Sequence, residues 1–262
     1  MFFKVQQELM RRKSATLYMK NIFDTTGELV EKMNSQFLDE NKETHDLLEI
    51  CLLWALETIS GSFLDTNLNC LKQNLSRTSD AMRFVNALKV GLGDDLTELA
   101  LGPPVWKIWA TKSYKRFNQA AETVNDLTSK MVEKAKMESK TSSDKQGSIL
   151  QKLIARCGLD SPIPLLMCQD ALTAGVDTTG TTAAFLLLDL ARNKEKQEIL
   201  YREIREHAEE EITESGLARM KYLKACLHES QRLNSPINAL SRKTQEDTTI
   251  GGYKVPKGVN VR

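Results

Sequence analysis

Cysteine and histidine are scarce in this chain of 262 residues, and neither is spaced in a recognisable pattern. The 5 cysteines are odd in number and no pair is separated by two residues, which argues against a disulfide framework and against a structural zinc site. The 3 histidines are scattered, so a histidine-rich metal centre is not expected. The cysteines are Cys51, Cys70, Cys157, Cys168 and Cys226.

An excess of charge of either sign is also absent. The formal net charge is +1, so no overall electrostatic attraction to nucleic acid or anionic lipid is expected. There is no secretory signal and no uninterrupted apolar run of about 18 residues. The most apolar segment, "AAFLLLDLA", is interrupted by Asp189. We therefore expect a soluble chain, or one attached peripherally to a membrane, and leave open a targeting segment upstream.

Helical periodicity dominates the sequence up to residue 234. After Pro236, short β-prone pieces alternate with Gly251-Gly252 and Pro256-Lys257-Gly258. We expect one domain over 1–262, with a helical part at 1–234 and short strands at 235–262. Thr44 is a candidate cap, and 138–148 is expected to be a flexible loop. Helices are predicted at 18–40, 45–65, 79–99 with interruptions, 105–137, 148–158, 162–193, 194–210 and 218–233.

The stretch "AGVDTTGTT" places a glycine, an acid and several threonines in the middle of the longest predicted helix. One interpretation is close packing against a neighbouring helix, with threonine hydroxyls bonded back to carbonyls one turn earlier. However, a carboxylate in an apolar helix costs several kcal/mol unless it is paired or hydrated. Asp177 therefore favours a helix that opens at one point to admit water or a small ligand. An acid beside a hydroxyl can pass protons to such a ligand.

The second notable motif is "HESQRL", in which Glu229 and Arg232 stand one helical turn apart and can pair. An isolated pair of this kind is usually an ordinary surface ion pair. Here it lies 52 positions after Asp177, on an amphipathic helix that is followed by a proline and short strands. The two motifs together are more specific than either alone.

In this order and spacing, the motifs resemble those of cytochromes P450. "AGVDTT" matches the alanine/glycine–glycine–x–acid–threonine–threonine signature of that family's long central helix, and "HESQRL" resembles its glutamate–arginine helix. The segments "LLWALETISGSFLDTNLNCL" and "VWKIWATKSYKRF" look like the mitochondrial branch. The resemblance covers nearly the whole chain. It implies a mainly α, truncated cytochrome P450 fold, with a long central helix, surrounding helices and short β-strands near the C-terminus.

The resemblance also implies an activity and its residues. Family members bind haem through a cysteine thiolate and insert one oxygen atom from O₂ into an apolar small molecule. Asp177 and Thr178 would relay protons, and Ala174 and Gly175 would line the space above the haem. Glu229 and Arg232 would form a buried structural pair. Arg242 would contact a haem propionate, although a solvated strand residue is an equal alternative. The residues expected to face the substrate are Ile237, Asn238, Ala239 and Leu240.

The resemblance further implies partners and a location. Mitochondrial members receive electrons from an acidic iron–sulfur ferredoxin, and Lys221 and Lys224 fit its docking patch. The lysine expected four residues after Lys224 is His228 here, and a solvated helix face is the alternative. The expected location is the matrix side of the mitochondrial inner membrane, with peripheral membrane association.

The chain departs from the family pattern in lacking the phenylalanine–glycine–arginine–cysteine–glycine haem loop downstream of Arg232. None of the cysteines has a similar context, so no iron ligand is assigned. We expect an internal section of the fold that also lacks the N-terminal β-rich part and targeting segment. As a monooxygenase it should be inactive alone, and unstable or dependent on a partner. The alternatives are a non-catalytic helical module that binds a protein or lipid and, less favoured, an unrelated helical bundle.

Overall fold

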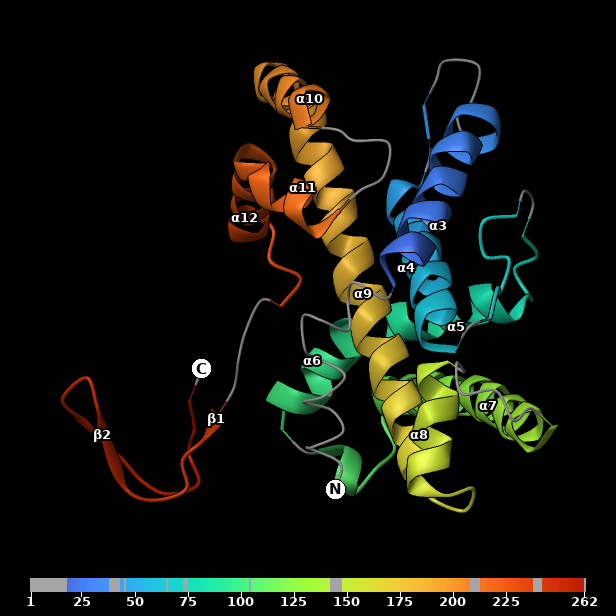
Figure 1. Ribbon diagram of the computed structural model, residues 1–262. Coiled ribbons are helices and arrows are strands. Elements are labelled where there is room, and N and C mark those ends of the chain that lie inside the picture. Colours follow the sequence, from blue (N-terminus) through green and yellow to red (C-terminus); the bar gives the residue numbers. More distant parts are fainter. Residues whose placement is uncertain are drawn as a thin grey trace.

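The computed structural model describes residues 18–37, 43–44, 46–64, 66–72, 75–103, 105–141, 148–207, 213–237 and 242–261. In this part of the chain the fold is mainly α, as predicted, and helix α9 (Ile163–Arg192) runs through the middle of the molecule (Figure 1). The other helices are α3 (Met19–Lys32), α4 (Leu47–Leu64), α5 (Asp80–Gly91), α6 (Asp94–Leu101), α7 (Lys112–Thr141), α8 (Ile149–Cys157), α10 (Lys194–His207), α11 (Glu214–Arg219) and α12 (Lys221–Leu233).

Side-chain caps fix where several helices begin. The Asp46 carboxylate accepts a hydrogen bond from the Glu49 N–H at 2.8 Å, so Asp46 caps α4 and the predicted Thr44 cap is wrong. Ser79 caps α5, and its hydroxyl accepts from the Met82 N–H at 3.3 Å, so the predicted start of this helix near residue 79 is confirmed. At α8, Ser148 and Gln151 form a capping box.

The tryptophan-rich segment before α7 differs from the prediction of one helix over 105–137. Val105–Lys107 form a 3₁₀ turn, and α7 starts at Lys112 because the Thr111 hydroxyl accepts from the Tyr114 N–H at 3.2 Å. Trp106 instead stacks on Tyr114, with ring centroids 5.5 Å apart. The helix then extends to Thr141, so the loop prediction is wrong for 138–141; residues 142–147 lie outside the described residues.

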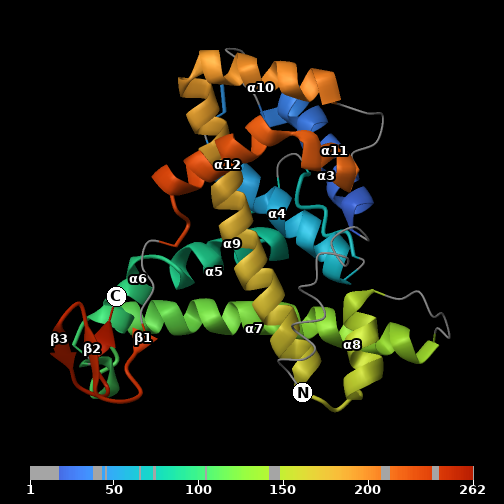
Figure 2. The same ribbon diagram turned by 60° about the vertical axis from the view of Figure 1, so that its left-hand side comes forward.

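The core lies where α4 packs against α9, with α5, α7 and α8 closing it below (Figure 2). Leu52 and Leu56 of α4 are fully buried, which confirms that this helix is interior. On α9 the buried stripe recurs every fourth residue and includes Leu172, Val176 and Gly180. A methyl group at Gly180 would stand 2.8 Å from Leu52 Cδ2 and 2.9 Å from Leu52 Cα, so the glycine allows the two helices to approach closely.

By length and composition alone, α4 and α9 are each apolar enough to cross a membrane. In this fold, however, more than half of α4 is buried against neighbouring helices. Much less of α9 is enclosed, because one side packs on α4 and the other side is open. Ala174, Asp177 and Thr178 of the central motif lie outside the buried stripe, whereas its two glycines face α4.

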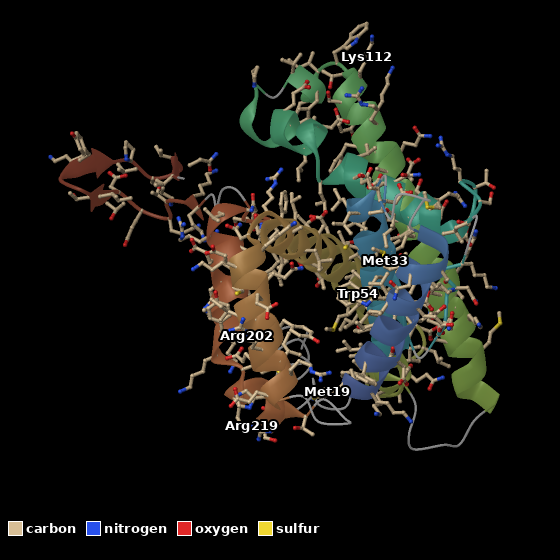
Figure 3. The ribbon with its side chains drawn as sticks, turned by 90° about the horizontal axis from the view of Figure 1, so that it is seen from above. Met19, Met33, Trp54, Lys112, Arg202 and Arg219 are labelled. Atoms are coloured by element: carbon tan, nitrogen blue, oxygen red, sulfur yellow. The ribbon has the colours of Figure 1, made fainter. Side chains whose placement is uncertain are left out.

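Two groups of helices flank α9. Figure 3 looks down on them: α3 and α4, with Met19, Met33 and Trp54, lie on one side, and the group with Arg202 and Arg219 lies on the other. The Trp54 indole N–H donates to the Thr26 hydroxyl at 3.2 Å and joins α4 to α3. On the opposite side α12 packs on both α9 and α10.

The predicted short strands are confirmed. β2 (Thr248–Ile250) and β3 (Tyr253–Val255) form an antiparallel hairpin, and β1 (Arg242–Lys243) pairs with β4 (Asn260–Val261). The hairpin turn is Gly251-Gly252, whose φ angles of 57° and 88° suit glycine and match the twist of the strands. The strands stand to one side of the helices (Figure 1).

Candidate functional site on helix α9

The central motif lies on an unbroken α-helix. α9 is α-helical through all of Ala174 to Thr182, so the predicted opening of the helix is wrong. The Thr178 hydroxyl donates to the Ala174 carbonyl at 2.7 Å, one turn earlier. This back-bond is the one anticipated by the close-packing interpretation.

The two glycines of the motif face the neighbouring helix. A methyl group at Gly175 would stand 3.4 Å from Ile59 Cγ1 of α4, and Gly180 packs on Leu52 as described above. Close packing therefore accounts for the glycines. The proposed role of Gly175 in lining a haem site stays a prediction.

Asp177 lies one turn before Gly180, at the edge of the buried stripe of α9, and is partly buried. Burial raises the pKa of this carboxyl group above its ordinary value, because desolvation disfavours the charged form. Within the described part of the chain, no hydrogen bond or ion pair engages the carboxyl group. Asp177 is thus a carboxylic acid that keeps its proton to a higher pH than usual, beside the hydroxyl of Thr178 and the exposed methyl group of Ala174.

The predicted pairing of Glu229 and Arg232 on α12 is confirmed. Arg232 donates from Nε and Nη2 to the two carboxylate oxygens, both at 2.7 Å, and these bonds lower the pKa of Glu229. The expected burial of the pair is wrong, since the side chains are 65% and 58% exposed. The Glu229–Arg232 pair is therefore exposed to solvent, and both of its members belong to α12.

The remaining predicted residues are spread over the C-terminal elements. Lys221 and Lys224 are exposed on α12, and the Lys224 ammonium donates to the Ala218 carbonyl at 3.3 Å. Ile237 is exposed. Asn238, Ala239 and Leu240 lie outside the described residues. Arg242 is exposed in β1, which Figure 1 shows apart from the middle of α9. The structure groups Ala174, Asp177 and Thr178, and it does not bring Arg242 to them.

Two carboxylates that sequence reasoning did not assign hold α12 in place. Asp189 accepts from Ser230 and Asn234, and Glu203 of α10 accepts from the backbone N–H groups of Tyr222 and Leu223. The interruption of an apolar run by Asp189 was the available signal. Glu203 lies in a helix rich in charge, where no pattern distinguishes it.

Comparison with known proteins decides the family. The family model described as cytochrome P450 matches residues 5–262. This chain belongs to the cytochrome P450 family. It is 31% identical over 98% of its length to probable cytochrome P450 12a5, mitochondrial, of Drosophila melanogaster, covering 49% of that protein. It is 28% identical to probable cytochrome P450 49a1 of the same organism, covering 98% of this chain and 45% of that protein. The chain thus spans about half the length of the curated relatives it matches.

A less similar relative is cytochrome P450 10 of Lymnaea stagnalis, which is 25% identical over 98% of this chain and 47% of that protein. Each of these relatives therefore aligns with nearly the whole of this chain.

Full-length cytochromes P450 bind haem, and the described residues fit one face of this group. The open side of α9 offers the methyl group of Ala174, the carboxyl group of Asp177 and the hydroxyl of Thr178 within about one helical turn. A flat apolar ring can lie against such a surface. A ligand bound on that ring would then be within reach of the Asp177 carboxyl group and the Thr178 hydroxyl.

The described residues do not fit the iron ligand. Burial raises the pKa of Cys51 to about 11 and that of Cys168 to about 12, and it raises the pKa of Cys70 still further. These three thiols therefore stay protonated at neutral pH. Cys157 and Cys226 are partly exposed in α8 and α12. Over the described ranges no cluster of histidine, cysteine and acidic residues is suited to a metal.

Proposed function

We propose that this chain is the proton-delivery section of a haem-thiolate monooxygenase that hydroxylates an apolar small molecule. The observation that carries the proposal is Asp177, a partly buried acid with a raised pKa, next to Thr178 on the open side of α9. The family to which the chain belongs supports the type of reaction. Haem, when bound, supplies the activation of O₂ and the oxygen-transfer chemistry.

The role of the chain's own residues is to hold and move a proton. Asp177 would hold a proton to a higher pH than an exposed aspartate does, since burial raises its pKa. The Thr178 hydroxyl proton is engaged with the Ala174 carbonyl at 2.7 Å. Its oxygen still has a lone pair that can accept a proton from Asp177. A transfer through Thr178 then requires the hydroxyl to turn away from that carbonyl and toward the ligand above Ala174.

We further propose a ferredoxin-type electron donor and a mitochondrial location. Lys221 and Lys224 are exposed one turn apart on α12 and offer two positive charges to an acidic partner. A relative at 31% identity carries the word mitochondrial in its name. The proposed position is the matrix side of the inner membrane, with peripheral attachment. We propose that Arg242 contacts a haem propionate and that residues 237–240 face the substrate.

A second candidate function is a non-catalytic helical module that binds a protein or lipid. The observation that favours it is the state of the cysteines: three are buried as protonated thiols, so the described residues provide no thiolate for iron. On this alternative, the open side of α9 would be an apolar contact surface.

The carbon-monoxide difference spectrum of the reduced protein, recorded during a haem titration, distinguishes the two functions. The 262-residue chain alone should show no thiolate-type Soret shift, because no suitable thiolate is present among the described residues. The longest form of the protein that can be expressed should show it. If the longest form binds no haem, the monooxygenase proposal is wrong and the binding module is favoured.

A further inference from the structure

Asp189 makes a polar contact between α9 and α12 that the proposed proton relay does not use. Its Oδ2 atom accepts from the Ser230 hydroxyl at 2.7 Å. The Asn234 side-chain amide donates to both carboxylate oxygens, at 3.3 Å to Oδ1 and 3.0 Å to Oδ2. Ser230 is 3% exposed, whereas Asp189 and Asn234 are partly exposed, so the contact is shielded from water on the Ser230 side. The acid in the apolar run therefore has three hydrogen bonds from one partner helix and its C-terminal cap.

At this contact all the hydrogen-bond donors belong to α12 and its C-terminal cap, and all the acceptors belong to Asp189. Ser230 and Asn234 present N–H and O–H donors, and an ionised carboxylate presents acceptors alone. In the described part of the chain no lysine or arginine forms an ion pair with Asp189. Removal of the acceptor would leave a buried serine hydroxyl without a partner, which is unfavourable.

The other end of α12 is held by a second carboxylate. Glu203 of α10 accepts from the backbone N–H groups of Tyr222 and Leu223, both at 2.8 Å, in the first turn of α12. Negative charge at this end is also favourable to the helix dipole. The Glu229–Arg232 pair lies between the two attachments and is bonded internally. The orientation of that pair therefore depends on how α12 is attached at its two ends.

We propose that Asp189 is a positioning residue that fixes α12 on α9 and thereby sets the placement of the Glu229–Arg232 pair relative to Asp177. Asp189 follows Asp177 by twelve residues on the same rigid helix, a rise of about 18 Å. Helix α9 therefore carries Asp177 directly and holds the helix of the Glu229–Arg232 pair through Asp189. The attachment itself stands on the contacts above, and its relevance to catalysis rests on the proposed function.

The test is amide hydrogen exchange, resolved by segment, on the 262-residue chain carrying Asp189→Asn. The asparagine keeps the shape but turns one carboxylate oxygen into an NH₂ group opposite the Asn234 amide. Exchange of α12 should become faster by about tenfold, since bonds to a charged acceptor are replaced by weaker ones. Exchange of α5 and α7 should change by less than about twofold. The matched control is Asp170→Asn, an exposed acid on α9 that should leave all segments unchanged.

A reciprocal exchange separates positioning from a general loss of stability. In the double variant Asp189→Asn with Asn234→Asp, the carboxylate accepts from residue 189 and the asparagine carbonyl accepts from Ser230. It should return α12 exchange to within about threefold of the unchanged chain. The proposal is overturned if Asp189→Asn behaves like Asp170→Asn, if all helices loosen equally, or if the double variant gives no recovery. Because haem is absent from this experiment, its failure would leave the monooxygenase proposal untouched.

Discussion

Two glycines of the central motif, Gly175 and Gly180, face α4 and permit close packing. Asp177 lies one turn before Gly180, at the edge of the buried stripe, and it is partly buried and without a hydrogen-bond or ion-pair partner in the described part of the chain. Close packing, one of the two interpretations raised by the sequence, is therefore confirmed at the glycines. The other, an opening of the helix at Asp177, is wrong because α9 is unbroken.

Asp177→Asn should stabilise the folded chain at neutral pH. Burial raises the pKa of Asp177 in the folded state, so its ionisation opposes folding once the pH exceeds the unfolded value of 3.8. The melting temperature of the variant should be about 1–2 °C higher at pH 7. The gain should disappear as the pH falls below the unfolded pKa, where both forms are neutral. Melting curves between pH 3 and pH 7 measure this, and a variant less stable than the unchanged chain at pH 7 would contradict it.

Gly180→Ala should destabilise the chain much more than Gly175→Ala. The new methyl group at position 180 would meet Leu52 atoms at 2.8 and 2.9 Å, whereas the one at 175 would meet Ile59 at 3.4 Å or more. Overpacking of this kind costs about 1–3 kcal/mol. Urea unfolding of the two variants in parallel makes the comparison. Equal midpoints would show that the contact between α4 and α9 is looser than the structure indicates.

At the level of helices, the sequence predicted α9, α12 and the strands from periodicity and turn residues. It did not predict that Trp106 and Trp109 lie before α7, because apolar spacing continues through a segment where the Thr111 cap restarts the helix. Nor did it predict the contacts of Asp189 and Glu203 with α12. These join residues 19 to 45 positions apart, and local spacing carries no information about them.

Glu203→Gln should weaken α12 in a pH-dependent way. In the folded state, desolvation opposes the charge of Glu203, but the backbone N–H groups of Tyr222 and Leu223 outweigh it and lower its pKa. Its stabilising effect is therefore present above the unfolded value of 4.5 and is lost as the pH falls through the lower folded value. Circular dichroism melts should show a less stable variant at pH 6–7 and convergence with the unchanged chain near pH 3. A constant difference across this range would contradict the assignment.

For the molecule as a whole, the family follows from the order of two motifs and is confirmed by comparison. The site is predicted less completely. Ala174, Asp177 and Thr178 lie within one turn of α9, and their proposed roles stay predictions. Arg242 stands in a strand apart from them, and the Glu229–Arg232 pair is exposed rather than buried. The chain spans about half of its relatives, and contacts made by the other half cannot be read from this section's periodicity.

The open side of α9 leads us to expect a weakly stable chain. Leu166 and Leu187 of α9 are each 48% exposed, and several other large apolar side chains are exposed elsewhere in the described residues. Such surface favours self-association. Light scattering during heating should detect aggregation at or before the unfolding transition. Cooperative, reversible unfolding of a monomer at high temperature would contradict this expectation.

The most direct test of the proposed proton relay is product formation by the longest expressible form of the protein carrying Asp177→Asn, compared with Asp170→Asn. We predict that Asp177→Asn lowers turnover at least about tenfold while the thiolate-type carbon-monoxide spectrum and the melting temperature are retained or improved. Asp170→Asn should alter none of the three. Unchanged turnover in Asp177→Asn, or a loss of turnover that merely follows a loss of bound haem, would show that Asp177 does not deliver protons.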